Sequence, residues 1–300
     1  MTTPQTPPTP PQQPAVPYGA PPAPGPFPAP GGHADAWQAA PGGSYTSPIP
    51  IRRTHLGNAL TSEWTKIRTV RSTMWTLGVF LILVIGVGLI LTAQTKDNDY
   101  GNVPYTLPAF FGLMLGQICL ITLGVLVITS EYGTGMIRTT LTASPQRHRV
   151  LAAKFLVFFA VAFVVSFVSI LLVGLAASSM HSGASSVGMG PSLLKGSLYV
   201  SLLGVLGLAV GAMLRHSAGA VTTMMGVVLL PAIVPAFLML ADSLKPIGRK
   251  MLDYNAPNAL AKIFGLDDGS GGGTPQLWLL VVVTAGAVAG AFALLDRRDV

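Results

Sequence analysis

Residues 130–154 read SEYGTGMIRTTLTASPQRHRVLAAK, and they separate two long hydrophobic runs. The segment carries most of the charge in its neighbourhood. Glu131 ends the first run, and Gly133 and Gly135 permit a sharp reversal of the chain. The sequence therefore predicts two antiparallel helices joined by a short charged connection.

The middle of this segment has its own helical pattern. Met136 with Thr140, and Ile137 with Leu141, are spaced by four residues, which predicts about two helical turns with one apolar face. Ser144 followed by Pro145 is typical of an N-cap and a first helical position, so we expect the next helix to begin there. That helix is expected to carry Arg147, Arg149 and Lys154 toward the lipid headgroups.

Composition places this connection in an integral membrane protein. Half of the 300 residues are apolar, a tenth are charged, and the mean hydropathy is +0.59. Long apolar runs without strict alternation predict helices and not a β-barrel. The fold class is therefore all-α and polytopic, with six transmembrane helices of roughly 20 residues each. The expected spans lie near 75–93, 108–129, 155–178, 197–214, 218–241 and 277–295.

The chain divides in composition near residue 50. Residues 1–50 hold 16 of the 25 prolines and no Lys or Arg, which predicts a disordered, cytosolic tail rich in Pro, Gly and Ala. We expect residues 51–300 to form the six-helix membrane domain.

An amphipathic helix is predicted over 54–73, lying along the membrane with Trp64 as an aromatic anchor. Its apolar face is expected to contain Leu56, Ala59, Leu60, Trp64, Ile67 and Val70, with Lys66 and Arg68 outside it or at its edge. Glu63 falls near the middle of that face. Two interpretations remain open for Glu63: a pair with Lys66 at i,i+3, or a contact with a basic residue of another segment.

Basic residues predict the orientation. With a cytosolic N-terminus, twelve Lys and Arg fall in inner segments and six in outer ones, so both termini are expected inside. The formal net charge of +7 is explained by these clusters beside hydrophobic runs, and nothing in their pattern predicts nucleic-acid binding. The outer loop 242–276 contains apolar residues and helix breakers; short interfacial helices and an unstructured loop remain alternatives for it.

Small residues and prolines predict how the spans pack. Three G-x-x-x-G pairs favour close helix approach in a tight bundle or a dimer. These pairs are Gly112 with Gly116, Gly207 with Gly211, and Gly286 with Gly290. Pro231 and Pro235 each remove a backbone donor, so the fifth span is expected to kink or break there.

No catalytic or metal-binding pattern is present in the sequence. It has no G-x-x-x-x-G-K-[ST] phosphate loop, so we expect no ATP hydrolysis by this chain, and it has no H-E-x-x-H motif. The central parts of the spans contain no Asp, Glu, Lys or Arg, which argues against proton or sodium coupling.

The segment 130–154, preceded by SEWTKIRT at 62–69, resembles the membrane subunits of bacterial ABC transporters of type 2, which are exporters. The pattern that carries the resemblance comprises Glu131, Gly135, Ile137, Leu141, Pro145, Arg147 and Lys154. The likeness covers roughly 54–300. It implies a six-helix permease in the bacterial cell membrane, a second permease copy in a homodimer or heterodimer, and short outer helices before the last span.

The resemblance also implies a separate nucleotide-binding ATPase subunit that carries the ATP and Mg, so this chain needs no cofactor of its own. The helix 135–142 would be the coupling helix, with Glu131 and Arg138 stabilising its base. The implied contact residues are Glu131, Gly135, Met136, Ile137, Arg138, Leu141, Pro145 and Arg147, together with the amphipathic residues Glu63, Trp64, Lys66, Ile67 and Arg68.

Two other functions remain open. Without the resemblance, Glu131 is a solvated carboxylate at a helix end and Arg138 an ordinary positive-inside residue. The chain would then fit a non-transporting membrane scaffold or an immunity protein. An ion-coupled secondary transporter is disfavoured by the missing charges at membrane depth.

Overall fold

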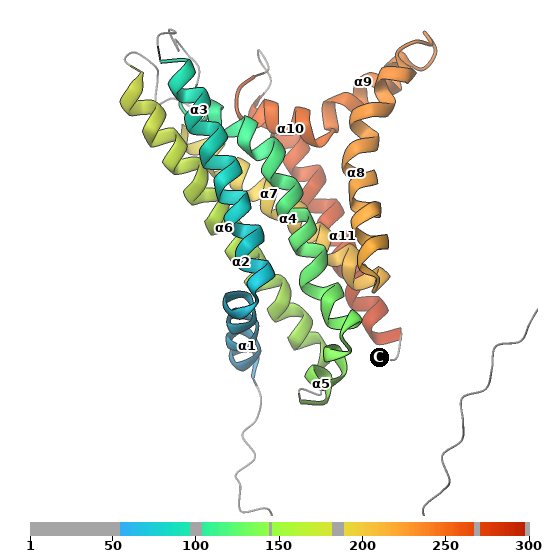
Figure 1. The fold of residues 1–300 in the computed structure, drawn as a ribbon. Helices are drawn as coiled ribbons and strands as arrows, with labels where there is room; N and C mark the ends of the chain where they lie inside the picture. Colours follow the sequence, from blue (N-terminus) through green and yellow to red (C-terminus); the bar gives the residue numbers. More distant parts are fainter. Residues whose placement is uncertain (1–54, 97–103, 144–145, 182–188, 267–270, 298–300) are drawn as a thin grey trace, which may run out of the picture. The chain divides into compact units, whose positions relative to one another are not determined.

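The computed structural model describes residues 55–96, 104–143, 146–181, 189–266 and 271–297. All of them lie in one compact unit, Arg53–Val300. Within this described part every regular element is helical (Figure 1). The predicted disordered tail at 1–50 lies outside the described residues and stays a prediction.

The helices follow one another with short connections. Their bounds are α1 Leu56–Thr69, α2 Arg71–Leu81, a π-helical turn Ile82–Gly86, α3 Val87–Gln94, α4 Leu107–Gly133, α5 Met136–Ala143, α6 Arg147–Met180, α7 Met189–Leu214, α8 Ser217–Leu238, α9 Lys245–Tyr254, α10 Ala256–Ile263, a 3-10 turn Gly271–Gly273, and α11 Thr274–Arg297.

Six of these segments are long and apolar enough to cross a membrane, which confirms the predicted fold class. The first span, Arg71–Gln94, combines α2, the π-helical turn and α3; the others are α4, α6, α7, α8 and α11. Helix α6 begins at Arg147, well before the expected start of its span at 155. This start is close to the one predicted for the helix at Ser144–Pro145, and the N-cap residue is Gln146.

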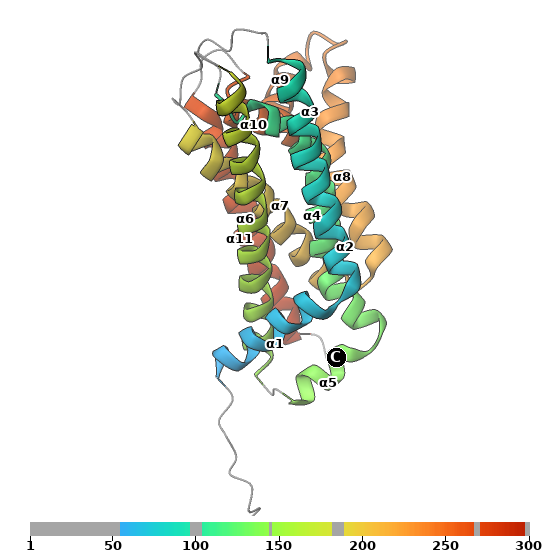
Figure 2. The same ribbon diagram turned by 60° about the vertical axis from the view of Figure 1, so that its left-hand side comes forward.

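The two ends of the bundle differ. Helices α1 and α5 and the carboxyl end of α11 lie at one end, hereafter the α5 end, and α9 and α10 lie at the other, the α10 end (Figures 1 and 2). Figure 2 shows α1 crossing the foot of the bundle at an angle to α2. The two helices meet at Val70, whose extended backbone (φ −77°, ψ 112°) separates them.

Helices α4 and α7 form the centre of the bundle, where their backbones almost touch. A Cβ built on Gly124 would lie 2.1 Å from the carbonyl oxygen of Gly204, and one on Gly207 would lie 2.7 Å from that of Ile121. Gly211 also faces α4, since its Cβ would meet the Val125 oxygen at 3.1 Å. Only glycine permits this separation, so α4 and α7 pack as one unit.

The first span packs on α4 through its π-helical turn. A Cβ on Gly112 would lie 2.6 Å from the backbone of Val84, and one on Gly116 would lie 3.0 Å from the Phe80 ring. Gly112 and Gly116 thus lie at a helix contact, as Gly207 and Gly211 do. Gly286 differs, because a Cβ there would meet nothing within 4 Å among the described residues.

Helix α8 continues through both of its prolines to Leu238, so of the two predicted alternatives the break does not occur, and the kink stays a prediction. Pro235 has no N–H to donate to the Pro231 carbonyl one turn earlier. Asn255 replaces that donor, because its Nδ2 lies 3.5 Å from the Pro231 oxygen. The Asn255 side chain also accepts a hydrogen bond from the backbone N–H of Asn258 and so caps α10.

The loop between α8 and α11 is helical, which decides between the two alternatives left open for it. Its helices are α9 and α10. Ala259, Leu260 and Phe264 are fully buried, so α10 and the residue that follows it belong to the core. Gln276 donates to the Asp253 carbonyl oxygen at 3.0 Å and links the start of α11 to this cap.

The α4–α7 contact predicts a contrast between two glycines. Gly124→Ala should destabilise the protein by about 1–3 kcal/mol, because the new methyl group would overlap the Gly204 carbonyl. Gly286→Ala, the matched control, should leave the unfolding temperature nearly unchanged. Thermal unfolding of the purified protein in detergent measures both, and equal losses would contradict the packing described above.

Candidate functional site

Four charged side chains from three helices meet at the α5 end of the bundle. Glu63 and Lys66 belong to α1, Glu131 to the end of α4, and Lys154 to the second turn of α6. Lys154 Nζ donates to Glu63 Oε2 at 2.6 Å and to Glu131 Oε1 at 2.8 Å. Lys66 Nζ donates to Glu63 Oε1 at 2.8 Å and to Glu131 Oε1 at 2.9 Å. We call these residues the four-charge network.

The network is largely removed from solvent. The side chain of Lys154 is 2% exposed, and those of Glu63, Glu131 and Lys66 are 4%, 9% and 27% exposed. Two positive and two negative charges cancel, so the site carries no net formal charge. A buried ion that loses its partner carries a large desolvation cost, so the four groups must stay together.

The attraction of its partners changes the pKa of Lys66 more than burial does. Burial alone would lower the pKa of its ammonium group, but hydrogen bonds and charge attraction from Glu63 and Glu131 raise that pKa above its ordinary value of 10.5. Lys66 is therefore protonated at neutral pH. Among the described residues Glu131 Oε2 has no hydrogen-bond partner, so this carboxylate uses a single oxygen for both of its contacts.

Both interpretations of Glu63 prove correct at once. It pairs with Lys66 on its own helix and with Lys154, 91 residues later in the chain. The buried face of α1 is centred on Glu63 and Ile67, and Lys66 lies at its edge. Other residues of the predicted apolar face do not contact the bundle closely, since Leu56, Trp64 and Val70 are 38%, 48% and 45% exposed; their contact with the membrane stays a prediction. Arg68 is exposed, as expected.

Helix α5 occupies the position predicted for the short helix of the connection. Gly135 has a φ of +72°, a conformation that side chains disfavour, and it turns the chain between α4 and α5. Ile137 is 7% exposed and anchors α5, whereas Met136 is 51% exposed. Exposed Arg138 forms no ion pair within the described part of the chain, and Glu131 contacts Lys66 and Lys154 instead. Glu131 and Arg138 thus do not contact each other, and the stabilisation of the helix base predicted for them stays a prediction.

The start of α6 corrects a second expectation. Arg147 is half-buried and Arg149 is exposed, but Lys154 points into the network and not toward the headgroups. The Ser144–Pro145 pair and the side chain of Leu141 lie outside the described residues. Their predicted roles are untested.

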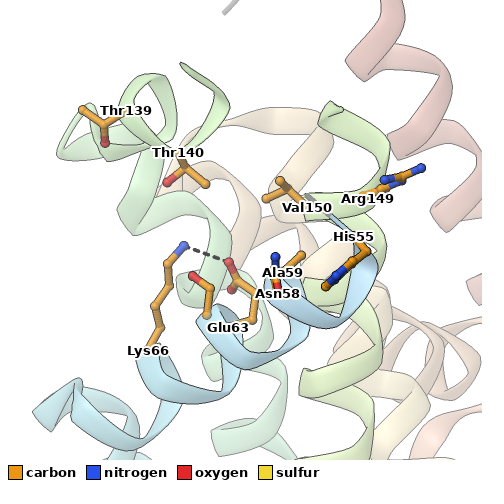
Figure 3. Close-up of a pocket in the computed structure, with 10 residues that line it drawn as sticks. His55, Asn58, Ala59, Glu63, Lys66, Thr139, Thr140, Arg149 and Val150 are labelled. Atoms are coloured by element: carbon orange, nitrogen blue, oxygen red, sulfur yellow. Dashed lines mark hydrogen bonds and ion pairs between the residues drawn. The ribbon is translucent and has the colours of Figure 1, made fainter. Parts of the chain in front are cut away.

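A pocket of about 340 Å³ opens beside the network, between α1, α5 and α6. Figure 3 shows Glu63 and Lys66 on one of its walls, with Thr139 and Thr140 of α5 across from them. His55, Asn58 and Arg149 line the rest of the opening. A second cavity of about 340 Å³ lies on another side of Lys66, Glu131 and Lys154. It is bounded by α4 and by the junction of α1 and α2. Among the described residues no group of His, Cys, Asp or Glu could hold a metal ion.

Two further contacts at the α5 end were not predicted from the sequence. His148 Nε2 lies 3.1 Å from Asp296 Oδ1 and joins α6 to the end of α11. The guanidinium of Arg215 lies 5.1 Å from the centre of the Tyr132 ring, joining the ends of α7 and α4. The sequence offered one kind of signal for such contacts, namely charged residues at the margins of apolar runs, such as Asp296 and Lys154.

The network predicts unequal effects for its two lysines. Lys154→Met should destabilise the protein by about 3–5 kcal/mol, since it leaves Glu63 and Glu131 with only Lys66. Lys66→Met should cost less, because Lys66 is partly exposed and Lys154 remains. Adding Glu131→Gln to Lys154→Met should restore part of the loss. Thermal unfolding of the four proteins tests this order, and equal losses for the two lysine variants would refute it.

A comparison with known protein families identifies the family of this chain. The sequence model of a family described as "ABC-2 family transporter protein" matches residues 59–241. This range begins in α1 and runs past the end of α8, so it includes the whole four-charge network and α5. Among curated proteins no significant match is found. The match covers more than half of the 300 residues, and the chain therefore belongs to the ABC-2 family of transporter membrane proteins.

Proposed function

We propose that this chain is the membrane-spanning permease subunit of an ATP-binding-cassette exporter, driven by a separate nucleotide-binding subunit. The four-charge network is the observation that carries the proposal. It holds α1, α4 and α6 together beside α5, on which Met136, Arg138 and Thr139 are exposed. A partner that pushes on α5 would act directly on three helices of the bundle.

The geometry suggests how movement would be transmitted. Only Thr134 and Gly135 separate α5 from α4, and Ile137 fixes α5 to the bundle. Displacing α4 alone would pull Glu131 away from Lys66 and Lys154, which is costly for buried charges. Helices α1, α4 and α6 would therefore tilt together. Such a rigid-body movement is the kind that alternating access requires.

The same proposal assigns the energy source and the partners. The sequence has no phosphate loop, so ATP and Mg would be bound by the partner subunit. Helices α8 and α11 are each only 17% buried over their most apolar stretch. Phe237, Leu230 and Val282 are more than half exposed, so these spans have apolar surface left for lipid or for a second permease copy, identical or related.

The location follows from charge. At the α5 end lie Lys66, Arg68, Arg71, Arg138, Arg147, Arg149, Lys154, Arg215 and Arg297. Basic residues favour the cytosolic side of a membrane. We therefore propose that the α5 end and both termini are cytosolic, in the plasma membrane of a bacterium.

A non-transporting scaffold or immunity protein is the second candidate. A scaffold has no use for an exposed short helix placed beside three helices that buried charges join, and this observation favours the transporter. An ion-coupled secondary transporter would need a coupling-ion site; charged groups of the described chain gather at the ends of the spans and not at their centres.

The coupling role of α5 can be tested at its exposed methionine. Met136→Asp should weaken co-purification with the nucleotide-binding subunit by about tenfold or more and abolish ATP-dependent transport, because a charge would enter a buried contact. The unfolding temperature should not change, since Met136 is 51% exposed.

Met180→Asp is the matched control: Met180 is 44% exposed and ends α6 at the other end of the bundle. It should assemble and transport normally. Full assembly and transport by the Met136 variant would exclude α5 as the contact.

The orientation has a separate test. The test uses a reporter that is active only in the cytosol. Fused after Val300, it should be active, because both termini are proposed to lie there. Protease protection of the same fusion in right-side-out vesicles gives an independent readout. A reporter exposed outside the cell would reverse the proposed topology.

A further inference from the structure

An apolar groove runs between α6 and α7 away from the α5 end. Phe159 and Phe163 of α6 line one side, and Leu194 and Leu198 of α7 line the other. Its volume is about 340 Å³. The aromatic side continues along α6, because the ring centres of Phe163 and Phe167 are 6.0 Å apart and those of Phe159 and Phe163 are 5.9 Å apart.

Lys195 is the one charged residue that lines this groove. Its Nζ donates to the Gly272 carbonyl oxygen at 3.1 Å and to Thr274 Oγ1 at 2.8 Å. Both acceptors are neutral, and no carboxylate within the described part of the chain pairs with it. An ammonium group has three N–H donors, so one donor and the full positive charge remain for another group.

The backbone at Gly272 lies close to the ammonium group of Lys195. Gly272 has a φ of +64°, and a Cβ there would lie only 3.1 Å from Lys195 Nζ. Thr274 begins α11, so the lysine joins α7 to the turn before the last span. The ammonium is therefore held in place at the edge of the groove by two contacts, and its position does not depend on a flexible side chain alone.

We propose that this groove binds an anionic phospholipid, with an acyl chain along Phe163 and Phe159 and the phosphate on Lys195. An acyl chain matches the apolar walls, and a phosphate oxygen supplies both the acceptor and the negative charge that Lys195 lacks. The groove lies between two spans and is bordered by exposed Leu194, so a lipid could enter it sideways from the bilayer.

Depth in the bundle supports this orientation of the lipid. A Cβ on Gly196 would lie 2.8 Å from the Phe264 ring and 3.5 Å from Ile170, which places the Lys195 region near the α10 end. Phe159 lies eleven residues before Ile170 on α6, or about 16 Å along a helix. That length is close to half of the roughly 30 Å hydrocarbon layer, which is the depth one acyl chain occupies.

The test uses the full chain in nanodiscs that contain phosphatidylglycerol and phosphatidylcholine, with native mass spectrometry of the lipids retained after release. The wild type should retain phosphatidylglycerol preferentially. Lys195→Gln should reduce that retention about tenfold, because it removes a charge-assisted hydrogen bond. Leu194→Trp should reduce retention of both lipids, because the new side chain would fill a groove that Leu194, itself 54% exposed, now borders.

Lys250→Gln is the matched control, since Lys250 is exposed on α9 at the same end and its loss changes the net charge equally. It should retain phosphatidylglycerol like the wild type. Unchanged retention by the Lys195 variant, or an equal loss in the Lys250 variant, would overturn the proposal. Inorganic phosphate should not compete, since it has no acyl chain; competition would assign Lys195 to a soluble anion and overturn the lipid site.

Discussion

Burying charge in a low-dielectric environment is tolerable only while opposite charges remain in contact, and this constraint governs the α5 end of the molecule. Glu63, Glu131 and Lys154 come from three different helices, and each is less than a tenth exposed. A helix that moved alone would leave an unpaired ion behind. The elements that meet there are thereby limited to concerted movements.

The centre of the bundle obeys a different constraint, which is steric. Gly124 and Gly204 bring the backbones of α4 and α7 so close that no side chain fits between them. Because α4 also ends in Glu131, the steric contact and the ionic contact share one helix. A movement of α4 is therefore expected to reach the most buried span, α7, directly through the contact between their backbones.

Hydropathy alone predicted all six spans, since lipid requires long apolar helices and leaves few alternatives. The short helix after Gly135 was also predictable, because its periodicity and its glycine are local signals. What depended on distant residues was harder to predict. Glu63 was known to interrupt an apolar face, but nothing local shows that its partner is Lys154, 91 residues away.

The errors have the same origin. The kink or break expected at Pro231 and Pro235 was judged from the helix alone; the helix does not break, and Asn255 from the following loop supplies a donor to the Pro231 carbonyl. Lys154 was assigned to the headgroups because lysine at a helix start usually lies there. The closest backbone contact was also missed, since Gly124 and Gly204 belong to no G-x-x-x-G pair within one helix and meet only in the folded bundle.

The π-helical turn Ile82–Gly86 has a consequence for the whole first span. A π turn contains one residue more than an α turn, and one residue corresponds to about 100° of rotation about the helix axis. Phe80 before the turn and Val84 within it face Gly116 of α4, whereas Gly88 after the turn faces Val173 of α6. The first span thus packs against two neighbouring helices, α4 and α6, which lie in different directions from it.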